Sequence, residues 1–453
     1  MNRILLVLLA GCYSMAPAYE RPAAPVPASL PGGQGSAAQL PLAQFVKDPK
    51  LVQILTRVIS QNRSLRRTAL DIESARQLYR IQRAHELPSI DLGVGVTSTR
   101  SLIGTPDNAT GRFTQYGVDV GLANWEIDLF GRLKSLSDAK LQTYLSSIEA
   151  AKATRISLVA ETAGAYITLA ADRSRLAIAK ETMDTSKKAM DLTELLVGGG
   201  TSNRGDFWQA STVFQQARGD VAVLTAAITQ DKDALELLAG GPLDDSLMPD
   251  VLPDHLDWFE DVPVGMSSAV LLERPDVLAA EHDLMSANAN IGAARAQFFP
   301  SLTLTATGGL ASVGLAALFT GPAAVFTLAP ALALPLFRGG ANRANLAYSK
   351  AQKESLIAAY EFAIQTAFRE VSDALATRCT IEEALAAQVA LVDASQKALE
   401  LSQARFRAGV DTFLTTLISE RALYAAKNSL VATQLAVMGN RVTLYRVLGG
   451  GLN

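Results

Sequence analysis

The feature that most constrains this chain is an internal duplication. Residues 88–92 (PSIDL) recur as residues 300–304 (PSLTL), about 210 residues later, and Asn62 falls opposite Arg274 at the same offset. Residues 238–240 (LAG) likewise pair with residues 448–450 (LGG). Repetition at a fixed period indicates one structural unit built twice. We therefore expect a first repeat at residues 48–241 and a second at 267–453, joined by a linker at 242–266.

Both halves show the same order of elements, namely a helix, a hairpin of two strands, a very long helix, a tight turn and a last helix. We expect the helices of the first half near residues 48–86, 131–197 and 202–240, with the hairpin at 88–129. Those of the second half fall near 267–297, 338–408 and 412–448, with the hairpin at 299–337. The pattern predicts an α+β fold with a duplicated helix-hairpin-helix-helix unit.

The long helices carry a seven-residue repeat that is typical of coiled coils. From Ile364 to Phe406 the pattern follows an unbroken 4-3 spacing. Helices of some 70 residues would be about 100 Å long, so each needs neighbours to cover its apolar seam. The shorter helices could stack end to end to match the long ones, which gives four helical rods per chain.

The two hairpins decide which environment the chain occupies. Residues 296–336 hold no charged residue, yet their glycines and prolines would break a transmembrane helix. Instead, apolar and small polar residues alternate with period two, as in Leu92, Val94 and Val96. One face then suits lipid and the other suits water, although a soluble sheet with one buried face would show the same alternation. Four strands cannot close a membrane barrel, so two or three chains must assemble.

The amino terminus has the layout of an export signal. Arg3 precedes an apolar run at residues 4–10 and the pair Gly11-Cys12, which predicts a signal peptide at 1–11. The site resembles the lipobox of bacterial lipoproteins, in which the cysteine receives acyl chains, palmitate among them. Ordinary cleavage after residues 16–18 is the alternative. With Cys12 acylated, residues 12–47 form an extended, lipidated tether, and Tyr13 in place of the aspartate that retains lipoproteins in the inner membrane favours the outer membrane.

Composition argues against several classes of function. The net charge of -3 gives no basic surface for nucleic acid, and the three histidines are far apart in the sequence. Residues 198–200 (GGG) lack the lysine of a nucleotide-binding loop. We therefore expect no catalytic residues, no metal and no cofactor beyond the lipid on Cys12, and hence no enzyme. Cys379 is expected to be a free thiol without an assigned role.

The order of elements, the lipobox, the strand ends at 335–339 (PLFRG) and the segment 405–411 (RFRAGVD) together resemble the TolC family of outer-membrane efflux proteins, in particular its OprM-like lipoprotein branch. The resemblance implies a homotrimer whose twelve strands form one barrel, continuous with a periplasmic tunnel of twelve helical rods, and places the linker 242–266 in an equatorial region. It also implies a periplasmic adaptor protein and an inner-membrane pump of the resistance-nodulation-division type as partners.

In that family the two helix turns at the periplasmic end form a constricted gate. Here they are residues 198–206 and 409–415, and Asp411 and Asp206 match acidic positions of the family. Arg405, Arg407 and Arg204 are candidates for bonds to these aspartates or to carbonyls. The aspartates could equally be helix caps, and the arginines could serve only the helix dipole.

The sequence also departs from the family pattern at this end of the helices. Phe406 stands where a tyrosine is expected, and Thr415 and Ile418 stand where other branches carry aspartates. The detailed latch must therefore differ from that of those branches.

The function that follows is a passive exit duct for small molecules, anchored in and spanning the outer membrane, with a long periplasmic part. A channel for type I protein secretion, a structural envelope lipoprotein and a secreted enzyme on a helical scaffold are the alternatives. The sequence does not identify the transported compounds, the particular adaptor or the particular pump.

Overall fold

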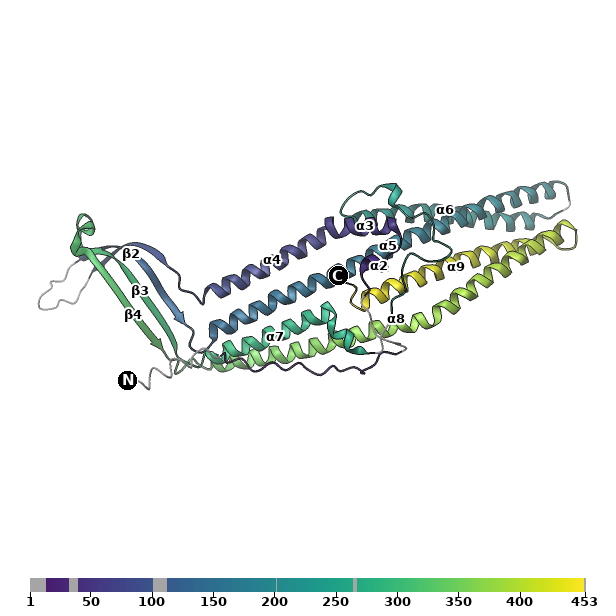
Figure 1. Ribbon diagram of the computed structural model, residues 1–453. Helices are drawn as coiled ribbons and strands as arrows, with labels where there is room; N and C mark the ends of the chain where they lie inside the picture. The colour runs from purple at the N-terminus through teal and green to yellow at the C-terminus, as the bar shows by residue number, and fades with distance from the viewer. Residues whose placement is uncertain (1–13, 32–39, 101–111, 201, 264–266, 452–453) are drawn as a thin grey trace. The chain divides into compact units, whose positions relative to one another are not determined.

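The computed structural model describes residues 14–31, 40–100, 112–200, 202–263 and 267–451. Two compact units divide the chain. We call them the sheet unit, whose described residues are 14–23, 71–100, 112–148 and 279–361, and the turn unit, which holds the other described residues. The strands lie in the sheet unit, and both helix turns lie in the turn unit (Figure 1).

The helices follow the duplicated order. The first half contains α2 (Leu42–Phe45), α3 (Pro49–Gln61), α4 (Arg63–Ala84), α5 (Arg132–Gly198) and α6 (Arg204–Ala239). The second half contains α7 (Pro275–Ala296), α8 (Ala341–Arg407) and α9 (Phe413–Val447), and short 3-10 turns lie at η1 (Asp245–Leu247), η2 (Ser268–Glu273), η3 (Leu315–Phe319) and η4 (Gly321–Ala323). None of the helices in the described ranges combines the length and apolarity that crossing a bilayer would need.

The four strands form one antiparallel sheet in the order β1 (Asp91–Arg100), β2 (Arg112–Ile127), β3 (Ser301–Ser312) and β4 (Ala324–Ala333). The two hairpins therefore pair side by side, through β2 and β3. The connection between β3 and β4 contains η3 and η4, while the connection between β1 and β2, residues 101–111, lies outside the described residues.

Strand register separates the two faces of the sheet. Leu92 lies opposite Val120, Val120 opposite Gly308, and Gly308 opposite Phe326, so all four share one face. On this face Leu92 is 69% exposed and Phe326 74% exposed. Glycine, threonine and alanine predominate on the other face, which also carries Asp91 and Asp119. The sheet thus presents an apolar surface that the described residues of the chain leave exposed, as the alternation predicted.

Two expected helices are each broken near their start. The helix expected at 48–86 is divided at Asn62, and the one expected at 267–297 begins as η2 and is divided at Arg274. Both residues have extended backbone angles, with ψ of 130° and 135°. Arg274 precedes Pro275, which disfavours helical geometry at the residue before it. Asn62 instead caps α4 by accepting hydrogen bonds from the backbone of Ser64 and Leu65.

The two breaks form equivalent joints in the two repeats. Asn62 Nδ2 donates to the carbonyl oxygen of Leu238, near the end of α6, at 2.7 Å. Arg274 donates from its guanidinium to the carbonyl oxygen of Val447, the last residue of α9, at 2.8 Å. In both repeats a side chain at the start of one helix thus satisfies the free end of another. The short helices are stacked end to end as expected.

The core of the turn unit includes an aromatic stack beside these joints. The Phe45 ring lies 5.2 Å from that of Phe259 and 4.2 Å from that of Tyr445. Phe45 is fully buried, and Leu51, Ile54 and Val58 of α3 are buried as well. This core lies at the C-terminal ends of α6 and α9. The turns lie at the opposite ends of these two helices.

Candidate functional site at the two helix turns

The turn between α8 and α9 is closed by its own backbone. Gly409 has a φ of +72°, a conformation that L side chains rarely adopt. Its N–H donates to the carbonyl of Phe406, and the N–H of Val410 donates to that of Arg405, both at 2.9 Å. These two bonds define a Schellman motif, which ends α8 at Arg407 and directs residues 409–412 into α9.

Within this turn the structure brings Arg405 and Asp411 together. Arg405 Nε donates to Asp411 Oδ2 at 2.6 Å, and a second guanidinium nitrogen donates to Oδ1 at 3.0 Å. This bidentate bond from Arg405 lowers the pKa of Asp411 below its ordinary value, because it stabilises the charged carboxylate. The carboxylate is half-buried and the guanidinium is exposed, so solvent screens the pair.

In the turn between α5 and α6, Asp206 is held by contacts with Ser202 and Asn203. Asn203 caps α6 by accepting from the backbone N–H of Asp206 at 3.0 Å. The Ser202 hydroxyl donates to Asp206 Oδ2 at 2.8 Å. Asp206 lies in the first turn of α6, where a negative charge also suits the helix dipole.

The other predicted arginines stand apart from the aspartates. The side chains of Arg204 and Arg407 are exposed, and neither makes a hydrogen bond or ion pair with any residue in the described ranges. Of the predicted contacts between arginines and aspartates, the structure contains the one between Arg405 and Asp411. A gating role for these five residues stays a prediction.

An apolar cluster joins the two helical hairpins close to the turns. It consists of Ala210 and Val213 from α6 and Phe413 and Leu417 from α9, all buried. Phe406 packs against it, with its ring 5.1 Å from that of Phe413. The phenylalanine at position 406 therefore serves packing, which a hydroxyl would not improve. By contrast, Thr415 and Ile418, the other two departures from the family pattern, are exposed.

Farther from the turns, polar side chains of α9 reach across to the first repeat. Arg421 contacts Thr212 of α6, and Tyr424 donates to Asp220 of α6 at 2.7 Å. Lys427 pairs with Glu181 of α5 at 2.9 Å. Sequence reasoning missed these contacts. The only sequence signal is the spacing of three donors, at 421, 424 and 427, along one face of α9.

Sequence reasoning also missed Glu420, a carboxylic acid in the buried stripe of α9. It is 7% exposed, and its Oε1 has no hydrogen-bond partner among the residues that the structure describes. Burial raises the pKa of Glu420 from its ordinary value of 4.5 to about 7. Glu420 is the single glutamate of α9, and the sequence around it gives no sign that its side chain is buried.

The other predicted chemical features lie elsewhere or outside the description. Cys12 lies outside the described residues, and Cys379 is an exposed free thiol on α8.

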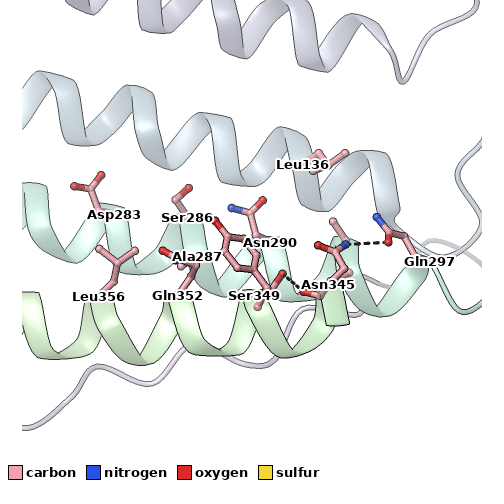
Figure 2. A pocket seen from close by; sticks show the side chains of 13 residues that line it. Leu136, Asp283, Ser286, Ala287, Asn290, Gln297, Asn345, Ser349, Gln352 and Leu356 are labelled. Atoms are coloured by element: carbon pink, nitrogen blue, oxygen red, sulfur yellow. Dashed lines mark hydrogen bonds between the residues drawn. The ribbon is translucent and has the colours of Figure 1, made fainter. Parts of the chain in front are cut away.

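A cavity of about 510 Å³ lies between α5, α7 and α8 in the sheet unit (Figure 2). Amide and hydroxyl side chains such as Asn345 and Ser349 line it. Asn345 donates to Gln297 Oε1 at 2.9 Å, and Ser349 donates to the backbone carbonyl of Asn345 at 3.0 Å. In the described ranges no group of histidine, cysteine and acidic residues could hold a metal ion.

Comparisons with known proteins cover nearly the whole chain. The family described as "Outer membrane efflux protein" matches residues 54–241 and 266–450. The chain is 41% identical over 459 residues to the solvent efflux pump outer membrane protein SrpC of Pseudomonas putida, covering 98% of this chain and 97% of the relative. It is 39% identical to the outer membrane protein OprJ of Pseudomonas aeruginosa, covering 100% and 95%.

Solved structures agree with these sequence matches. A membrane protein from Pseudomonas aeruginosa is similar with a TM-score of 0.91 at 40% identity, covering 97% of this chain and 98% of the other. The open state of the MtrE outer membrane channel of Neisseria gonorrhoeae is similar with a TM-score of 0.89 at 34% identity, covering 97% and 99%. The predicted fold class is therefore confirmed.

Proposed function

This chain belongs to the outer membrane efflux protein family, and on that premise we propose how its parts carry out export. It is an outer-membrane protein that serves as the exit duct of an efflux pump. The observation that carries this conclusion is the family match to both repeats, together with a sheet whose apolar face is exposed among the residues that the structure describes. The details below are our proposals.

We propose that three copies assemble, so that twelve strands close a barrel and twelve helical rods continue it as a tunnel. One chain supplies four strands, and β1 and β4 are edges of its sheet. An open edge in lipid would leave backbone groups without partners, so further chains must pair with both edges. The repeats at 48–241 and 267–453, with the linker 242–266 between them, supply the two hairpins; the family match to 54–241 and 266–450 supports this division.

The amino terminus is proposed to be a lipid anchor. Cleavage of the signal peptide 1–11 would leave Cys12 to carry the acyl chains, followed by the tether at 12–47. Mass spectrometry of the amino-terminal peptide from outer membranes tests this, because the acylated cysteine and a chain beginning after residue 18 have different masses.

The partners we propose are a periplasmic adaptor that grips the helix turns and an inner-membrane pump of the resistance-nodulation-division type. A passive duct has no energy source of its own, so a pump must supply it. Relatives are named for solvent and toluene efflux, and others for antibiotic efflux. We propose the same class of cargo here, small toxic compounds such as antibiotics and solvents.

The gate is proposed to lie at the two helix turns, with Arg405 and Asp411 holding the α8–α9 turn in its closed shape. Their bidentate bond fixes the turn beside Phe406, which packs on the cluster between α6 and α9. A ring of three such turns would narrow the duct and place acidic groups at Asp411 and Asp206 around it, a charge arrangement that favours cations.

Single-channel conductance in planar bilayers tests both the duct and the gate. We expect small, rarely open currents from the wild type, and clearly larger ones after Arg405→Ala combined with Asp411→Ala. Arg407→Ala is the matched control, because it removes an exposed arginine of the same turn that has no partner in the described part of the chain. A large wild-type conductance would keep the duct and discard this gate, whereas folded oligomer without conductance would argue against the duct itself.

A further inference from the structure

The first residues that the structure describes lie against helices of the sheet unit. Asn288 of α7 donates to the carbonyl oxygen of Pro17 at 2.8 Å, and Arg295 donates to that of Met15 at 3.1 Å. The hydroxyl of Ser14 lies 3.1 Å from that of Ser135, in the first turn of α5. Ser14, Met15 and Pro17 thus each contact a side chain of α5 or α7.

The strongest contact in this segment is made by Glu281 of α7. Its side chain is 5% exposed and receives two bonds from Arg21, both at 2.6 Å. The Tyr19 hydroxyl adds a third bond at 3.1 Å. A buried carboxylate without such donors is costly, so Glu281 favours the docked segment over a detached one.

α7 is also shaped to receive the segment. A Cβ added at Gly292 would lie 2.6 Å from the backbone nitrogen of Ala16 and 2.7 Å from Ser135 Oγ. Glycine in the middle of a helix lowers its stability, and nothing in the helix geometry requires one here. Its place in α7 therefore reflects the close approach of residues 14–21.

We propose that residues 14–21 form a strap that positions the lipid anchor at the base of the sheet. This inference rests on the proposed acylation of Cys12. Cys12 precedes Ser14 by two residues, which span about 7 Å when fully extended. Ser14 is held at the first turn of α5, and α5 follows directly on β2. The acyl chains would thus enter the membrane at a set distance from the strand ends, and Glu281 is the positioning residue.

A simple tether would behave differently. A chain rich in proline, alanine and glycine needs no receptor to connect a lipid to a protein, and its reach grows with every residue added. If residues 14–21 are docked, residues inserted before Ser14 change the distance between the lipid and the sheet. Residues inserted after the strap leave that distance unchanged.

Docking is tested first, by hydrogen exchange of the amides at 14–23 in the purified full-length oligomer. We expect roughly tenfold faster exchange or more in Glu281→Gln, because the charge-assisted bonds to Arg21 are lost. Gly292→Ala should release the strap as well, although alanine favours the helix. Asp283→Asn is the matched control, since Asp283 lies on the same helix but lines the cavity of Figure 2. Unchanged exchange in both strap variants would overturn the proposal.

Positioning is tested with insertions of six Gly/Ser residues. An insertion between Tyr13 and Ser14 would lengthen the path to the lipid by about 20 Å, and we expect a several-fold loss of assembled oligomer in the outer membrane. The same insertion between Ala23 and Ala24 should leave assembly unchanged. Equal yields from both insertions would overturn the strap.

The outcome is separable from the proposed function as a whole. If wild-type protein carries no lipid on Cys12, the strap proposal fails, yet conductance of the purified oligomer still reports on the duct. If lipid is present but the oligomer does not conduct, the duct fails while the insertions still test the strap.

Discussion

Glu420 shows how much a single side chain can depend on its surroundings. The apolar stripe of α9 that buries it also packs against the first repeat, close to the contacts of Arg421 and Tyr424. The packed state favours the neutral acid, whereas an opened state lets water reach the carboxylate. Proton loss from Glu420 therefore opposes packing of α9.

We expect the packing of α9 to weaken as pH rises. Between the ordinary glutamate pKa of 4.5 and about 7, the packed state holds a proton that the opened state releases, so stability falls across this window. The shift corresponds to about 3 kcal/mol at most. Protection of the α9 amides, corrected for intrinsic exchange, should be higher at pH 5 than at pH 8, and Glu420→Gln should abolish the difference.

Glu400→Gln is the control for that experiment, because Glu400 is exposed and bonds only to Gln396 in the described structure. It should keep the wild-type pH dependence. If Glu420→Gln also keeps it, another group is responsible.

Residues near turns were easier to predict than residues on helix faces. Asp411 and Asp206 were predicted because they match acidic positions of the family that the sequence resembles, and Arg405 because it ends the helix before the turn at Gly409. Glu420 and Tyr424 have their properties because of which helix they face. A heptad pattern predicts that a seam is covered but not by which partner, so these residues could not be found without the fold.

At the scale of the elements, adjacent glycines in β3 occupy very different environments. A Cβ at Gly309 would overlap the carbonyl oxygen of Val118 in β2, whereas one at Gly308 would meet only the Phe326 ring at 3.9 Å. Gly309 lies on the face where β2 and β3 approach closely, opposite Asp119. The sheet thus has a point where two backbones touch.

We expect Gly309→Ala to weaken the pairing of the two hairpins by about 1–3 kcal/mol, the usual cost of overpacking. The measurement is the temperature at which the detergent-solubilised oligomer dissociates. Gly308→Ala, one residue away, should leave this temperature nearly unchanged. Equal effects of the two substitutions would show that backbone contact between β2 and β3 does not limit stability.

The strands and long helices were predictable because periodicity reports burial directly. The predicted starts and ends of α5, α6, α8 and α9 agree with the structure to within about three residues. The breaks at Asn62 and Arg274 were not predicted, since the apolar pattern continues across both. Pro275 was a signal for the second break, because proline disfavours a helical residue before it. Asn62 gave a weaker signal, because asparagine is favoured at helix N-caps but is not confined to them, and its bond to Leu238 depends on α6.

At the scale of the whole molecule, the sheet of one chain is incomplete. β1 and β4 each pair with one neighbour within the chain, and the other edge of each strand has no partner in the described structure. Backbone groups at these edges need partners if the sheet is to enter lipid. Assembly and membrane insertion are therefore coupled.

We expect hydrogen exchange to reveal this coupling. Amides shared by β2 and β3 should be protected in both monomer and oligomer, whereas the outward-facing amides of β1 and β4 should be protected in the oligomer alone. The measurement compares amide exchange in the monomer and oligomer fractions after they are separated by size in detergent. Protection of the outer amides in isolated monomers would contradict a barrel shared between chains.

The paired joints at Asn62 and Arg274 have a mechanical consequence. A continuous helix can bend sharply only by giving up hydrogen bonds of its own backbone. α6 and α4 are instead separate helices whose ends meet, and the Asn62 amide joins them. α9 and α7 meet in the same way through the guanidinium of Arg274. The angle between two such helices can change at the joint while the backbone hydrogen bonds of each helix stay formed. The duplication therefore gave each half of the chain one point at which it can flex, at equivalent positions in the two repeats.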